Sequence, residues 1–105
     1  MGFEKMAEDI IDQQNKLFPH LEDLRHHEEM PESLKRAMDA VRAWSDKVEA
    51  HDEAAINNSQ PAEEFAIELE KHRGMIGKHW EPEIDKYRDL VNNYAETDVL
   101  ATDYE

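Results

Sequence analysis

Apolar side chains recur every three or four positions over residues 3–30, a spacing that places them on one face of an α-helix. Gln14 occupies one step of this stripe, and a second apolar seam lies beside it. The stripe consists of Phe3, Met6, Ile10, Leu17, Leu21 and Leu24, and the seam of Ala7, Ile11 and Phe18. Pro19 falls inside the pattern, where its missing backbone donor predicts a kink or a split of this helix.

A second helix is predicted from Pro31 to about residue 58. Proline is favoured at the first position of a helix, because its fixed φ suits the helix and its missing N–H has no partner there. The stripe of this helix is Leu34, Met38, Val41, Trp44, Val48, His51 and Ala55.

A third stripe begins after Ser59 and Pro61, and the acids that follow them suit the first turn of a helix. Its apolar positions are Phe65, Leu69, His72, Ile76 and His79 or Trp80, followed by Ile84, Tyr87, Val91 and Tyr94. The register continues past Pro82, so the pattern fits one long kinked helix or two collinear ones, with a break favoured close to Glu81. Gly74 and Gly77 inside the pattern indicate close helix packing or a kink, and close packing is the favoured interpretation.

No segment alternates apolar and polar residues for long enough to predict a strand. We therefore expect an all-α fold, an antiparallel bundle of three long helices that becomes four if Pro19 or Pro82 produces a full turn. Residues 1–95 form the single helical domain, and residues 96–105 lose the pattern and are expected to be an acidic flexible tail.

Composition narrows the functional classes. The chain has 105 residues and no cysteine, which excludes disulfides, thiolate metal sites and thiol nucleophiles. It contains no apolar run long enough for a signal peptide or a membrane span, so a cytoplasmic protein that contacts no membrane is expected. No phosphate loop, nucleophile elbow or Ser-His-Asp set is present, so we expect no enzymatic activity and no cofactor.

The net charge of −14 repels nucleic acid and attracts basic protein surfaces. Residues 1–33 and residues 81–105 each contribute −6, and the middle of the chain contributes −2. Direct nucleic-acid binding is therefore not expected, and a basic protein is the expected partner.

The segment HLEDLRHHEEMPE, residues 20–32, is the densest group of acids and histidines in the chain. Carboxylates projected along a helix can imitate the phosphate rows of a duplex and occupy a nucleic-acid-binding protein. The predicted partner-binding residues are Glu22, Asp23, Glu28, Glu29 and Glu32, with Trp80 as an aromatic interface anchor. The chain resembles, in class and not in motif, the small acidic inhibitors that phages direct against restriction and CRISPR systems. We accordingly expect a non-enzymatic inhibitor or adaptor of the DNA-mimic, anti-CRISPR kind.

The alternative hypothesis is a metal-binding bundle. The letters His-His-Glu in the same segment resemble the ligands of hemerythrin-like and ferritin-like helical bundles. Helix geometry separates most of the six histidines along an up-down-up bundle. The set that can converge is His20, His79 and Glu83, which suits zinc or non-haem iron.

Self-association is also expected. Long helices around a thin core leave side seams exposed, notably Ile11 with Phe18, and such a seam favours a homodimer.

Overall fold

The computed structural model describes residues 2–26 and 30–103, and the side chains of residues 4–26 and 30–96. Within these residues every element is helical and no strand occurs, which confirms the all-α class. The elements are α1 (Gly2–His26), α2 (Glu32–Glu49), α3 (Glu53–Ile56), α4 (Gln60–Lys71), α5 (Arg73–Ile76), the 3₁₀ turn η1 (Lys78–Trp80) and α6 (Glu81–Asp103).

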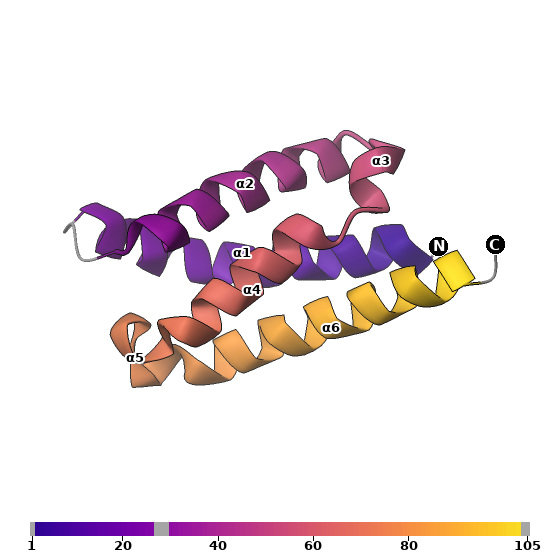
Figure 1. Cartoon of the computed structure of the whole chain (residues 1–105). Coiled ribbons are helices and arrows are strands. Elements are labelled where there is room, and N and C mark those ends of the chain that lie inside the picture. Colours follow the sequence, from indigo (N-terminus) through magenta and orange to yellow (C-terminus); the bar gives the residue numbers. More distant parts are fainter. Residues whose placement is uncertain (1, 27–29, 104–105) are drawn as a thin grey trace.

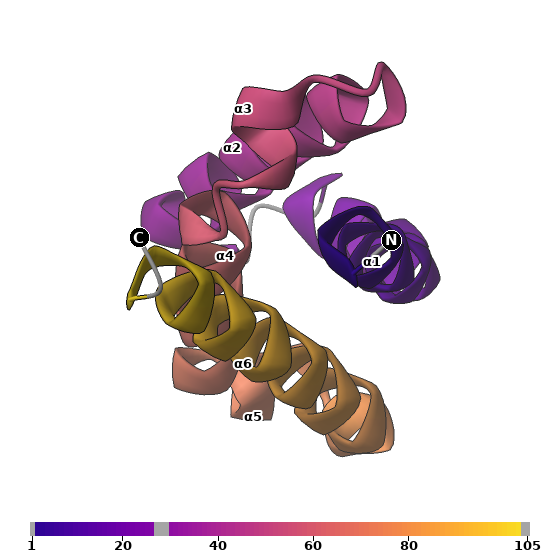
Figure 2. The same cartoon turned by 90° about the vertical axis from the view of Figure 1, so that its right-hand side faces the viewer.

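The four long helices α1, α2, α4 and α6 enclose one core in a particle measuring 45 × 24 × 20 Å. Helix α1 packs against α6 and α2, and α4 packs against α2 and α6 (Figures 1 and 2). The start of α1, the helix α3 and the end of α6 share one end of the molecule, and α5 lies at the other (Figure 1).

The prediction of three long helices is not confirmed, because the third predicted helix is divided by a full turn of the chain. Helix α4 stops at Lys71, and α6 begins at Glu81 with Pro82 in its first turn, as the sequence indicated. Gly77 carries the reversal with a φ of 124°, a conformation that side-chain-bearing residues rarely adopt. The prediction of close helix packing is wrong at Gly74, since no atom of a neighbouring element lies within 4 Å of the place that a Cβ would occupy.

Pro19 does not split the first helix, which runs unbroken from Gly2 to His26. The proline is exposed, and its ring removes only the one backbone donor at its own position. The second predicted helix, in contrast, ends early at Glu49. His51 turns the chain with a φ of 62°, and α3 follows as a separate single turn.

The acidic tail is not confirmed either. Helix α6 continues to Asp103, so residues 96–103 extend a helix. Tyr104 and Glu105 lie outside the described residues.

A chain of hydrogen bonds crosses the apolar core. The hydroxyl of Tyr87 on α6 donates to Gln14 Oε1 on α1 at 2.7 Å, and Gln14 Nε2 donates to Ser45 Oγ on α2 at 2.8 Å. Ser45 Oγ in turn donates to the Val41 carbonyl at 2.9 Å. Burial raises the pKa of Tyr87 well above its usual value, so the phenol stays protonated and can donate.

Buried aromatic rings anchor α3 in the same way. Trp44 Nε1 donates to the Ala55 carbonyl at 2.9 Å, and the Tyr94 hydroxyl donates to the Ile56 carbonyl. These bonds fix the connection between α2 and α4 against the core.

Removing the Tyr87 hydroxyl leaves the buried Gln14 carbonyl without its donor. We expect Tyr87→Phe to lower the free energy of unfolding by about 1–3 kcal/mol. The double variant Tyr87→Phe/Gln14→Leu recovers part of this loss, because both ends of the bond become apolar. Urea denaturation of the single and double variants measures both effects, and additive losses would contradict the coupling.

Candidate functional site

Two of the predicted partner-binding carboxylates lie within reach of basic side chains of the chain itself. Glu22 Oε1 lies 3.6 Å from Arg42 Nη2 and 3.8 Å from Arg25 Nη1. Glu32 Oε1 lies 3.8 Å from Lys35 Nζ, and Asp23 is exposed. Glu28 and Glu29 lie outside the described residues. Glu22 and Glu32 therefore do not present a row of unpaired charge.

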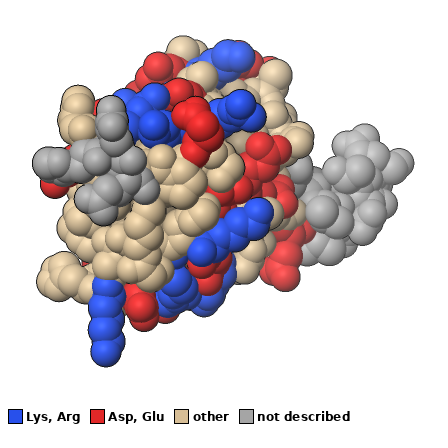
Figure 3. Space-filling model, turned by 60° about the vertical axis from the view of Figure 1, so that its left-hand side comes forward, with Lys and Arg blue, Asp and Glu red and all other residues tan. Residues whose placement is uncertain are grey.

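The same part of the molecule carries a bidentate ion pair between α1 and α2. Arg25 Nη1 and Nη2 donate to Asp39 Oδ1 and Oδ2 at 2.9 and 3.2 Å. This hydrogen bonding raises the pKa of Arg25 and lowers the pKa of Asp39. Figure 3, which brings the left-hand side of Figure 1 forward, shows basic side chains interspersed with the acidic ones. This face is mixed in sign.

Ion pairs also concentrate where α4 turns into α6. Arg73 lies 2.9 Å from Glu70 and 3.1 Å from Asp85, and Arg88 lies 3.0 Å from Glu70. The hydrogen bond with Glu70 is the main cause of the raised pKa of Arg73. Arg73 and Arg88 are thus engaged with acids of the same chain.

The net charge collects at the opposite end. Residues 2–15 carry −3, residues 46–64 carry −5 and residues 89–103 carry −4, so these ranges account for −12 of the total −14. We call them the acidic end. Their only lysines or arginines are Lys5 and Lys47.

Contacts between these segments show that they meet in space. His51 Nδ1 donates to Glu4 Oε2 at 2.6 Å, which joins the turn after α2 to the start of α1. The Tyr94 hydroxyl reaches the Ile56 carbonyl, which joins α6 to α3. Sequence reasoning found two acidic stretches but missed the third, because only the antiparallel course of the helices brings residues 46–64 beside the other two.

Trp80 is half-buried and packs against the core. Its ring stacks on His20 with centroids 4.8 Å apart, and His20 Nε2 donates to the Ile76 carbonyl at 2.7 Å. This ring therefore braces the turn before α6, and its use as an interface anchor stays a prediction.

The alternative metal ligands do not assemble into a metal site. Glu83 Oε1 accepts a hydrogen bond from Gln13 Nε2 at 2.6 Å, and His79 is exposed with its ring edge-on to Trp80. No group of three metal-ligating side chains occurs among the described residues. The structure offers no support for a site built from His20, His79 and Glu83.

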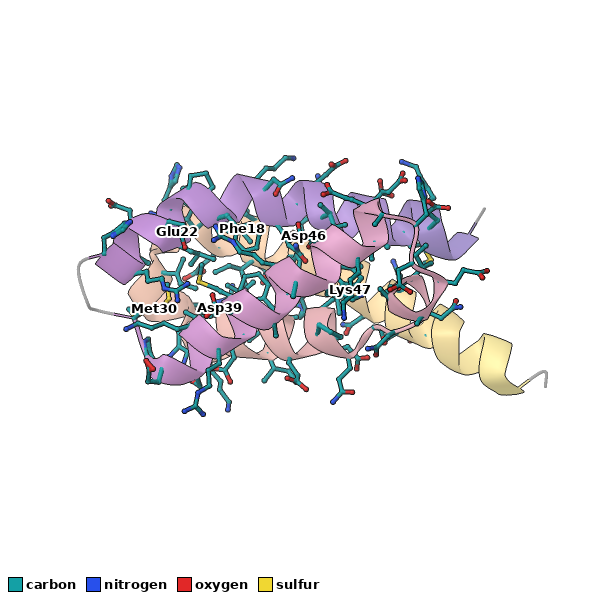
Figure 4. All side chains as sticks on the ribbon, turned by 90° about the horizontal axis from the view of Figure 1, so that it is seen from above. Phe18, Glu22, Met30, Asp39, Asp46 and Lys47 are labelled. Carbon is teal, nitrogen blue, oxygen red and sulfur yellow. The ribbon has the colours of Figure 1, made fainter. Side chains whose placement is uncertain are left out.

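A groove of about 450 Å³ separates α1 from α2, and we call it the α1–α2 groove. It is lined by Ile11, Asn15, Phe18, Pro19, Glu22, Arg42, Ser45, Asp46 and Glu49. Ile11 and Phe18 are only 5% and 9% exposed, so the prediction that they form an exposed seam is wrong. They lie at its base, and Figure 4 shows Phe18, Glu22 and Asp46 along the line between the two helices.

Ile67 on α4 is the exposed large hydrophobic residue of the described part of the chain, at 55%. It lines two shallow hollows, one shared with Val91 of α6 and the other with Ala37 and Ala40 of α2. This position, and not the Ile11 seam, is the apolar feature that faces outward.

Comparisons with protein-family models, curated proteins and solved structures found no match. Among the described residues, no helix is both long and apolar enough to cross a bilayer.

His20 serves as a test of the metal hypothesis. We expect His20→Ala to lower the free energy of unfolding by about 1–3 kcal/mol, because the Ile76 carbonyl loses its donor and Trp80 loses its stacking partner. His79→Ala is the matched control, with an expected effect within about 0.5 kcal/mol. Urea denaturation gives the stabilities, and elemental analysis after incubation with zinc or iron gives the metal content. Stoichiometric metal that disappears in both variants would restore the metal hypothesis.

Proposed function

We propose that the chain is a small, non-enzymatic, cytoplasmic inhibitor or adaptor that binds a basic protein surface through its acidic end. The observation that carries this proposal is the segregation of charge, with −12 of −14 collected in three segments that meet at one end. A concentrated field of one sign speeds the encounter with an oppositely charged partner. The same field disfavours nucleic acid and anionic membranes as direct ligands.

The acidic end, and not residues 20–32, is the proposed contact surface. Glu22 and Glu32 lie near Arg and Lys side chains, and a charge that is already compensated contributes little to long-range attraction. Asp46, Glu53 and Glu96 are exposed carboxylates of the acidic end. They belong to α2, α3 and α6, so the surface draws on several helices.

The more specific form of the proposal is a DNA mimic that occupies a nucleic-acid-binding protein, as an inhibitor of restriction or CRISPR systems does. Carboxylates spread over neighbouring helices approximate a patch of phosphate charge. Competition separates this form from a general adaptor, because duplex DNA displaces a mimic from its partner and leaves an adaptor bound.

Charge reversal tests the proposed surface. We expect Glu53→Lys/Glu96→Lys to weaken binding of a basic partner by about tenfold or more, a loss of about 1.4 kcal/mol. Asp23→Lys/Glu32→Lys makes the same charge change in the segment first predicted and is expected to weaken binding by less than about threefold. The partner is captured from a host lysate on the immobilised protein and identified, and its Kd for each variant is measured at low and high salt.

Circular dichroism checks that every charge-reversal variant keeps its helical content. A partner whose affinity is insensitive to salt, or equal for the two reversals, would contradict the proposal, since screening weakens electrostatic contacts.

The expected homodimer needs a surface other than the seam of Ile11 and Phe18, because that seam is buried. We propose that two copies associate through the face around Ile67, because their acidic ends repel each other. The charges along its hollows are of both signs. Three bases, Arg36, Lys71 and Arg88, line them together with four acids, Glu63, Glu64, Glu68 and Glu70. A face of mixed charge around an apolar residue is compatible with an isologous contact.

Ile67→Lys is therefore expected to shift the protein to the monomer without changing its helical content, since the side chain is already exposed. Ile67→Leu is the control and keeps the dimer. Sedimentation equilibrium at low and high salt measures the association, which salt should strengthen because it screens the repulsion. A wild-type protein that stays monomeric at all concentrations would overturn this prediction.

A further inference from the structure

The α1–α2 groove combines an apolar base with polar walls. Ile11 and Phe18 of α1 form the base, while Glu22 of α1 and Asp46 and Glu49 of α2 stand along the walls. Its volume of about 450 Å³ falls within the usual range for pockets that enclose several side-chain-sized groups. An occupant must therefore offer apolar surface and complement the charge of the walls.

The groove already contains one guanidinium, that of Arg42. Its Cζ atom lies 4.8 Å from the ring centroid of Phe18, and its Nη2 lies 3.6 Å from Glu22 Oε1. A cation over an aromatic face beside a carboxylate is a favourable arrangement, and arginine forms it better than lysine because its planar group stacks on the ring. The contacts of Arg42 thus illustrate the kind of group that this surface accepts.

The groove also holds a buried hydrogen-bond acceptor that has no donor in the described part of the chain. Glu22 Oε1 is buried and accepts no hydrogen bond from the described residues. Pro19 has no N–H, so the Asn15 carbonyl lacks the donor that an ordinary residue 19 would give it. Asn15 and Pro19 both line the groove.

The charge of the walls is only partly compensated. Arg42 lies beside Glu22 and balances it, which leaves the −2 of Asp46 and Glu49. Asp46 and Glu49 are exposed and belong to the acidic end, which makes the groove continuous with the surface proposed to bind a basic partner.

We propose that the α1–α2 groove receives a cationic amphipathic segment of the partner protein, with an arginine of that segment bound between Asp46 and Glu49. An apolar side chain of the same segment packs on Ile11 and Phe18. The five donors of a guanidinium suit the carboxylate oxygens of Asp46 and Glu49, and a helical or extended segment is long enough to present both groups. This inference rests on the proposed function and narrows it to one site and one ligand chemistry.

A short peptide with arginine and leucine on one helical face is the probe, labelled for fluorescence anisotropy. The control peptide carries citrulline in place of arginine, which keeps the size and removes the charge. We expect the arginine peptide to bind at least about tenfold more tightly than the citrulline peptide. Amide chemical shifts of residues 11–22 and 42–49 should change on binding.

Variants on either side of the groove sharpen the test. Asp46→Lys/Glu49→Lys is expected to weaken peptide binding by about tenfold or more, and it does not oppose the dipole at the end of α2. Arg42→Ala is expected to strengthen binding by about threefold, because it frees the Phe18 ring and Glu22 for the peptide. Arg36→Ala removes the same charge from the same helix outside the groove and is expected to change the affinity less.

The outcomes separate the groove from the acidic end as a whole. One outcome is that Glu53→Lys/Glu96→Lys abolishes peptide binding and Asp46→Lys/Glu49→Lys does not. The groove is then not the binding site, and the proposed function stands. If the groove variants behave as expected but no basic partner is captured from a lysate, the site stands and the proposed function fails. Equal affinity for the arginine and citrulline peptides overturns the inference outright.

Discussion

The hydrogen-bond chain through Gln14 determines how α1 lies against the other helices. A buried amide is costly unless both its donor and its acceptor are satisfied, and here Tyr87 and Ser45 satisfy them from α6 and α2. Few relative positions of three helices meet that requirement. Ile11 and Phe18 lie one turn before and after Gln14 on the same helix, so the base of the α1–α2 groove is positioned by the same bonds.

The antiparallel course of the helices explains the distribution of charge. Helix α1 begins and α2 and α6 end at the acidic end, so acids far apart in the chain accumulate there. At the α5 end, Arg25, Arg73 and Arg88 form ion pairs with acids on neighbouring helices. Exposed ion pairs contribute little stability individually, and their effect here is to cancel charge locally.

Much of the fold could be predicted from periodicity, and the exceptions have physical causes. The stripe of α2 and the start of α6 at Glu81 follow from apolar spacing and from proline. The turn after Lys71 could not be found this way, because Leu69 and Ile76 keep the helical register while the positive φ of Gly77 reverses the chain. The acidity of the candidate site was visible in the sequence. Its location was not, because only the antiparallel course of the helices brings residues 46–64 beside the start of α1 and the end of α6.

An elongated body with its charge at one tip behaves as an electric dipole along its 45 Å axis. In the field of an oppositely charged partner, such a molecule would turn before the two surfaces touched, and the first contacts would form end-on. The tip that carries α3, the start of α1 and the end of α6 would arrive first. The ion-paired tip would then be left pointing into solvent, where a second molecule could approach without competing with the first.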